Sequence, residues 1–260
     1  MEQEHASPSV GVERLGAWEQ AYWSLTVYER AGEAGGAFVA AGHRRHGNGI
    51  RGAAADPVRA RAEAARRAGG KVRRYCASNG LNRLGTLTYR GAGCHDEDEL
   101  RAHVGEFFRA LRVGLGGRSL PYLWVPEWHK SGHGLHVHFA VGQYVRRSMI
   151  DRAWGRGFVH IKLLSDLPVG STSWQESRRA ARYLSKYVTK AMERAEGSGR
   201  HRYDVAEGYQ PRAVRLRGSS PQQVIEQAQR LMGAAPAYQW SSSEALGWMG
   251  PPAMWLSWDR

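Results

Sequence analysis

The hydrophobic and polar positions follow a regular pattern from Arg83 onward, and this pattern predicts strands and helices in turn. Residues 84–89 alternate as in a half-buried strand, and glycines follow directly after them. Residues 96–112 repeat apolar side chains at helical spacing and begin with acidic residues, as a helix does. Ser173 with Glu176 three residues later is a capping box, which begins a long helix ending at about Glu193. The other elements expected here are strands at 121–128, 135–141 and 158–163, and a short helix at 146–154.

This order of elements predicts the fold class. Strand, helix, strand, strand, helix, strand, helix is the order of a split βαβ unit. We therefore expect an α+β protein of the ferredoxin or RRM-like kind, with an antiparallel sheet and its helices packed on one face.

The pattern is weaker on both sides of this region, which suggests three consecutive segments. We expect a basic, Gly/Ala/Arg-rich N-terminal region at 1–70, a central domain at 71–218, and a helix with a Trp-rich tail at 219–260. In the first segment, Asp56-Pro57 predicts a helix start, and Gly69-Gly70 predicts its end. The remaining expectations are a strand or partner-binding patch at 22–28, a basic, strand-like stretch at 200–217 and a helix at 220–232.

The charge of the chain narrows the choice of partner. Its 37 Lys and Arg residues outnumber 24 Asp and Glu residues, for a net charge of +13. Nearly all of the excess is arginine, whose planar forked donors suit phosphate, so nucleic acid is the leading partner and an anionic membrane surface the weaker one. The side chains expected to contact DNA are Arg73, Arg74, Arg179, Arg182 and Lys190.

Several classes of protein are disfavoured. Two cysteines, Cys76 and Cys94, are too few for a disulfide framework or a four-cysteine zinc module, and they suit a reduced cytoplasmic compartment. The acidic start does not look like a signal peptide, and no apolar run is long enough to span a membrane. No phosphate-binding loop of the nucleoside-triphosphatase kind is present, so any duplex unwinding is expected to come from a host helicase.

The strand at 135–141 carries candidate metal ligands. Because side chains of a strand alternate between faces, His136 and His138 point to the same side. A turn at Ser131-Gly132 would place Glu127 opposite His136 in a hairpin. Such a His, His, Glu set leaves coordination positions open and suits Mg²⁺ or Mn²⁺, although it could also take zinc. Of the turn residues, His129 and His133 are rival ligands that we expect to contact DNA or solvent instead.

The long helix carries a candidate nucleophile. At helical spacing, Tyr183, Lys186, Tyr187 and Lys190 share one face, and a separate apolar stripe at 181, 184, 188 and 191 would seat the helix on the sheet. Tyrosine becomes a usable nucleophile when cations and a metal-polarised electrophile assist it, and Lys186 offers such a cation. Two aromatic residues one turn apart can also serve packing alone.

Four short segments now combine. They are L-G-T-L-T-Y at 84–89, V-P-E-W at 125–128, H-V-H at 136–138 and Y-L-S-K-Y at 183–187. In this order they resemble the HUH endonucleases, and within them the replication initiator (Rep) proteins of rolling-circle plasmids and small single-stranded DNA phages. The resemblance covers roughly residues 72–217.

The resemblance implies a reaction and its partners. A Mg²⁺ or Mn²⁺ ion on His136, His138 and Glu127 would polarise a phosphate of single-stranded or hairpin origin DNA. Tyr183 or Tyr187 would attack that phosphate, which leaves a 5′-phosphotyrosine and a free 3′-OH for a host polymerase. Lys186 would position the DNA or balance the developing charge.

Three other functions remain open at this point. A single-strand transposase or a plasmid-transfer relaxase would use the same chemistry on a different DNA. An RRM-like protein that binds nucleic acid without cutting it would share the order of strands, but it displays aromatic residues where this chain has Val137 between two histidines. A zinc hydrolase would need a general base that the sequence does not assign.

Overall fold

The computed structural model describes residues 20–42, 56–163, 173–193 and 203–259, with the backbone alone at 162–163, 173–174 and 188–193. These residues form two compact units. The larger unit comprises residues 28–33, 49–213 and 259–260, and the smaller one comprises 1–27, 34–48 and 214–258. The division differs from three consecutive segments, because strands from the beginning of the chain share a sheet with strands from its end.

The larger unit is built on a five-stranded sheet in which every printed pairing is antiparallel. Its order is β6 (Gly157–Leu163), β3 (Arg83–Tyr89), β5 (Leu135–Val141), β4 (Tyr122–Trp128) and β7 (Asp204–Val205). Helix α2 (Glu97–Gly114) connects β3 to β4, and helix α3 (Arg147–Trp154) connects β5 to β6. The α+β class and the split βαβ order expected from the sequence are therefore confirmed.

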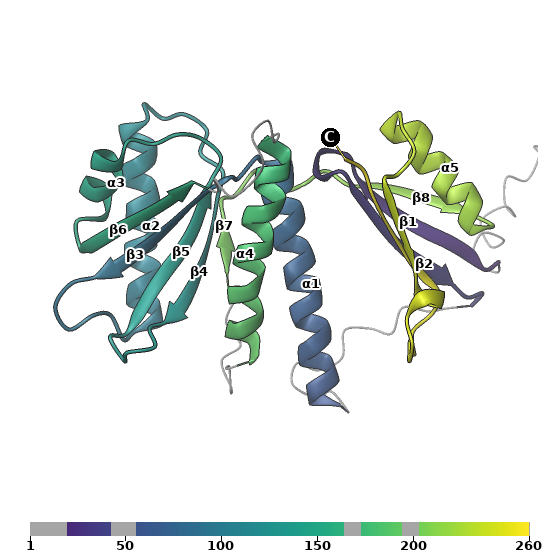
Figure 1. The fold of residues 1–260 in the computed structure, drawn as a ribbon, viewed down its shortest axis with the longest axis horizontal. Coiled ribbons are helices and arrows are strands. Elements are labelled where there is room, and N and C mark those ends of the chain that lie inside the picture. Colours follow the sequence, from purple (N-terminus) through teal and green to yellow (C-terminus); the bar gives the residue numbers. More distant parts are fainter. Residues whose placement is uncertain (1–19, 43–55, 164–172, 194–202, 260) are drawn as a thin grey trace, which may run out of the picture. The chain divides into compact units, whose positions relative to one another are not determined.

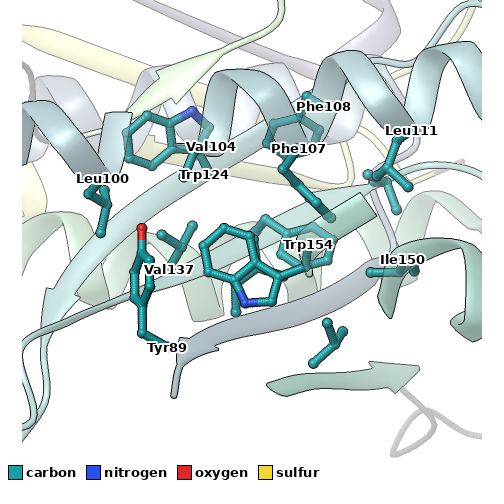
Figure 2. Packing of buried hydrophobic residues seen from close by; sticks show 14 of the residues in the cluster. Tyr89, Leu100, Val104, Phe107, Phe108, Leu111, Trp124, Val137, Ile150 and Trp154 are labelled. Carbon is teal, nitrogen blue, oxygen red and sulfur yellow. The ribbon is translucent and has the colours of Figure 1, made fainter. Parts of the chain in front are cut away.

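One face of this sheet holds the main hydrophobic core, against α2 and α3 (Figure 2). Phe107 and Phe108 project from α2, and Trp154 from the end of α3 packs at right angles to the Phe107 ring. The backbone of β3 comes close to Phe139, and a Cβ atom added at Gly85 would lie 2.1 Å from the Phe139 ring. Glycine is needed here because the aromatic ring fills the space of a side chain.

Two further helices cover part of the opposite face, which corrects the expectation of helices on one face only. They are α1 (Pro57–Ser78) and α4 (Ser173–Glu193), which lie side by side in Figure 1. The physical reason is a second apolar cluster on the strands, which has to be buried as well. Its strand residues are Leu84, Leu123, Val125 and Ala140, and its helix residues include Ala68, Val72, Ala180, Ala181 and Leu184.

Helix α1 begins where the sequence predicts and ends later. Asp56 accepts a hydrogen bond from the backbone N–H of Arg59 at 3.0 Å, as an N-cap does. The predicted stop at Gly69-Gly70 is wrong, because the helix continues to Ser78. Glycine in a helix costs about 1 kcal/mol relative to alanine, and the burial of Val72, Tyr75 and Cys76 in the next two turns offsets this cost.

The smaller unit has a sheet of its own. Its order is β8 (Val214–Gly218), β1 (Tyr22–Tyr28), β2 (Glu33–Val39), β10 (Ala253–Ser257) and β9 (Tyr238–Ser241), with short 3₁₀ turns at η2 (Glu29–Ala31) and η3 (Ser242–Glu244). Helix α5 (Pro221–Met232) packs Val224 and Ala228 onto the strand residues Leu25, Val27 and Leu256. The strands expected near 22–28 and 200–217 and the helix at 220–232 are present, and the Trp-rich tail supplies two strands that the pattern did not indicate.

In the described part of the chain, no helix combines the length and the apolar character that crossing a membrane requires.

A candidate metal centre beside two tyrosines

The β4–β5 hairpin brings the three expected ligands together. Glu127 pairs with His136 and Val125 with His138, which is the cross-strand register predicted from the turn. The hairpin closes where the backbone N–H of His129 donates to Gly134 at 2.8 Å. Because the strand alternates, Val137 and Phe139 enter the core under α2, whereas both histidines point to the opposite face.

The three ligand atoms converge. Nε2 of His136 lies 3.2 Å from Oε2 of Glu127, and Nε2 of His138 lies 2.9 Å from the same oxygen. The two Nε2 atoms are 3.0 Å apart. Both imidazoles are buried, with 8% and 7% of their surface exposed, and Glu127 is half-buried. Two imidazole nitrogens and a carboxylate oxygen held this close are a donor set that fits a divalent metal ion.

The outer nitrogens of the two imidazoles differ in their surroundings. Nδ1 of His138 is 3.1 Å from the hydroxyl oxygen of Thr86 on the neighbouring strand. A partner of this kind fixes the ring orientation of a metal-ligating histidine and leaves Nε2 free for the ion. Nδ1 of His136 is buried and finds no hydrogen-bond partner among the described residues. Burial lowers the pKa of His136 and Glu127 opposes that shift, so burial favours the neutral imidazole that can bind a metal.

Helix α4 places both tyrosines against this group. The ring of Tyr187 stacks on His138, with ring centres 3.9 Å apart and planes 25° apart. The Tyr187 hydroxyl donates a hydrogen bond to the Tyr183 oxygen at 2.7 Å. Buried Ala180, Ala181 and Leu184 seat the helix on the sheet, as the apolar stripe predicts. The tyrosine face of α4 therefore turns toward the candidate metal ligands.

The two tyrosines differ in how accessible they are. Tyr183 is 40% exposed, whereas Tyr187 lies deeper, between the Tyr183 ring and His138. Burial, together with the hydrogen bond to Tyr183, raises the pKa of Tyr187 well above its usual value. A molecule approaching from solvent meets the Tyr183 hydroxyl first.

The basic residues of α4 do not act as one group in the structure. Lys186 and Arg182 are exposed on α4, and Arg179 is half-buried. The side chain of Lys190 lies outside the described residues. Arg178, which the sequence did not single out, is half-buried, and burial lowers its pKa.

Arg73 and Arg74, expected to contact DNA, instead meet a carboxylate inside the larger unit. Arg73 Nε lies 2.6 Å from Glu33, and Arg74 Nη1 lies 3.3 Å from it. Glu33 is only 2% exposed, so this ion pair is largely internal. A single acidic residue between Gly32 and Ala34 carries no pattern by which a sequence could have indicated this role.

The rival histidines stay outside the ligand group. The ring of His129 lies 5.4 Å from that of His136, and its Nδ1 is 2.6 Å from the Ser131 hydroxyl. His133 Nε2 is 3.1 Å from the backbone oxygen of Tyr89. Thr86 is the one outer partner of the group that sequence reasoning missed, and its position opposite His138 follows only once β3 is known to pair with β5.

Comparison with known families adds one finding. Residues 82–192 match the model of a family of replication-associated proteins, the ORF2 type. This matched segment runs from the start of β3 to the end of α4, so it holds Glu127, both histidines and both tyrosines. No curated protein and no solved structure matches the chain. The matched segment is less than half of the 260 residues, and it supports a role of the replication-initiator (Rep) type.

Proposed function

We propose that this protein is a replication initiator of the HUH endonuclease kind, which nicks single-stranded or hairpin origin DNA by tyrosine attack on a phosphate. One observation carries the proposal: a convergent Glu, His, His group lies in direct contact with a pair of tyrosines from another element. Either feature alone has an ordinary structural explanation. Together they supply a phosphate-binding ion site and a nucleophile in one place.

The separation of the ligand atoms favours Mg²⁺ or Mn²⁺ as the ion. Donor atoms at adjacent corners of an octahedron lie about 3.0 Å apart when each is about 2.1 Å from the ion. Ligands of a tetrahedral zinc site lie about 3.4 Å apart at similar bond lengths. The observed separations of 2.9, 3.0 and 3.2 Å are closer to the octahedral value. When bound, such an ion would withdraw charge from a phosphate oxygen and make the phosphorus more electrophilic.

The hydrogen bond between the tyrosines suggests a division of labour. Tyr183 is the more exposed of the two, and its oxygen accepts the Tyr187 proton in a hydrogen bond. Tyr183 is therefore the first nucleophile, and Tyr187 holds its oxygen in position from the side of His138. With its own hydroxyl so close, Tyr187 can accept a strand in a second transfer.

The reaction conserves bonds of equal kind. The Tyr183 oxygen forms a bond to phosphorus, and the bond from phosphorus to the 3′ oxygen breaks. The phenol proton is transferred, in sum, to the 3′ oxygen that leaves, which gives a 3′-OH on which a polymerase can begin. Because one phosphodiester replaces another, the strand can be rejoined by the reverse reaction without a nucleoside triphosphate.

A covalent adduct tests the proposal. A pool of single-stranded oligonucleotides of random sequence, labelled at the 3′ end, is incubated with the protein and Mn²⁺. The labelled part remains on the tyrosine, so a protein band on a denaturing gel becomes labelled. We expect Tyr183→Phe to remove the first-strand adduct, Tyr187→Phe to reduce it, and the double variant to abolish it.

Controls separate chemistry from binding and folding. Tyr144→Phe changes an exposed tyrosine outside the site and should leave the adduct at the wild-type level. Chelation of the metal should remove the band. A band that persists in the double variant or without any divalent ion would refute the proposal.

A further inference from the structure

The sheet face that carries the metal ligands continues onto two strands that the helices leave open. Helix α4 contacts β4 and β5, whereas β6 is the edge strand on the other side of β3, away from α4 in Figure 1. Alternate residues of β3 and β6 therefore share a face with His136 and His138 but lie beyond the helix.

The register of the strands identifies these residues. Thr86 pairs with His138 on one side and with His160 on the other. Thr88 pairs with Phe158. On β6 the intervening Val159 is buried in the core, so Phe158 and His160 point to the face of the metal ligands.

Phe158 is unusual for a residue at this place. It is 71% exposed, although it is a large apolar side chain on a strand whose other face is buried. It has polar and basic neighbours, since Thr88 is half-buried beside it and His160 is exposed two residues further on. Arg90 follows on the same face of β3, exposed and oriented by a hydrogen bond of 3.1 Å to the backbone oxygen of Gly155.

An aromatic ring beside cations on an open sheet suits one class of ligand. Bases of single-stranded DNA stack on aromatic side chains, and their phosphates bind arginine, in a manner that tolerates any sequence. His160 lies two strands from His138, which is about 10 Å between Cα atoms. At about 3.4 Å per stacked nucleotide, that distance corresponds to no more than about three nucleotides.

We infer that Phe158 is a stacking platform for a base of the single strand whose phosphate is bound at the Glu127, His136 and His138 group, with Arg90 as its phosphate contact. The inference rests on the proposed function for the identity of the strand and deepens it by naming where the strand leaves the site. The strand crosses the sheet from α4 toward β6, and the base closest to the edge lies on the Phe158 ring. Phe158 thus positions the DNA, and the cut itself does not require it.

The test measures binding apart from cleavage. All variants are made in the Tyr183→Phe, Tyr187→Phe background, and the affinity for fluorescein-labelled oligothymidylate is measured by anisotropy. Phe158→Ala should weaken binding by about 5- to 100-fold, the usual effect of losing one base stack. Phe158→Trp should restore the affinity, because it keeps an aromatic face.

Two controls isolate the stack. Tyr144 is also 71% exposed but lies in the loop after β5, so Tyr144→Ala should change the affinity less than twofold. An abasic strand of the same length keeps the phosphates and removes the bases. The parent protein should bind it more weakly than oligothymidylate, and Phe158→Ala should bind the two strands equally.

The outcomes distinguish this inference from the proposed function. If Phe158→Ala binds oligothymidylate as the parent does, or still prefers it to the abasic strand, the platform is refuted even where the wild-type protein forms a covalent adduct. If the wild-type protein forms no adduct but the loss of preference is observed, the platform stands as a DNA-binding site and the nicking proposal falls.

Discussion

The hydrogen bond between Thr86 and His138 leads to a quantitative prediction about metal affinity. Thr86→Val replaces a hydroxyl by a methyl group of nearly the same shape, so it removes the 3.1 Å contact to Nδ1 without opening a cavity. Nδ1 of a ring that is 93% buried then loses this partner and no longer fixes the ring orientation. Nε2 remains present but is less well aimed at the ion.

The size of the effect follows from two independent considerations. Loss of an outer hydrogen-bond partner of a ligating histidine costs about 10- to 100-fold in metal affinity, or about 1.4–2.8 kcal/mol. Leaving a buried polar group without a partner costs about 1–3 kcal/mol. The two ranges agree, so we expect Thr86→Val to weaken Mn²⁺ binding by at least tenfold.

Isothermal titration of the purified protein with Mn²⁺ measures this affinity directly, without DNA. Thr86→Ser retains the hydroxyl and should bind Mn²⁺ within about threefold of the wild type. Thr88→Val makes the same change two residues further along β3, opposite Phe158, and should leave the affinity intact. Equal affinities of wild type and Thr86→Val, or an equal loss in Thr88→Val, would contradict the assigned role.

Two predictions concern stability. Glu33→Gln should lower the free energy of unfolding by about 1–2 kcal/mol, measured by urea denaturation, because Arg73 and Arg74 lose a buried counter-charge but keep partial contact with solvent. A gain in stability would show that desolvating Glu33 costs more than the pairs return. Gly85→Ala should destabilise the larger unit by about 1–3 kcal/mol in thermal unfolding, because its Cβ would meet the Phe139 ring; an unchanged midpoint would mean that the ring shifts freely.

Much of the larger unit was predictable because its signals are local. Each strand and helix from Arg83 to Glu193 has its own periodicity, and the Ser131-Gly132 turn fixes the hairpin register to one residue. The ligand group follows from that register alone. The contact between Tyr187 and His138 was expected only from the family resemblance, since α4 lies on the far side of two connections from β5.

The features that the sequence did not indicate depend on contacts between distant segments. The end of α1 is set by Val72, Tyr75 and Cys76 packing with α4, and no local signal competes with Gly69-Gly70. The role of Glu33 depends on two arginines about 40 residues away. Likewise, Phe158 looks like an ordinary strand residue until the pairing of β6 with β3 shows which face it occupies.

The pairing of the chain's first strand with its late strands has a consequence for synthesis on the ribosome. Trp23 pairs with Gly218, and the next strand in that sheet, β2, lies beside β10 near the C-terminal end. Nearly all of the larger unit is therefore translated while β1 and β2 still wait for these neighbours. During that interval their edges are open to other nascent chains, so slow translation or crowded polysomes should favour aggregation through these two strands rather than through the sheet that carries the histidines.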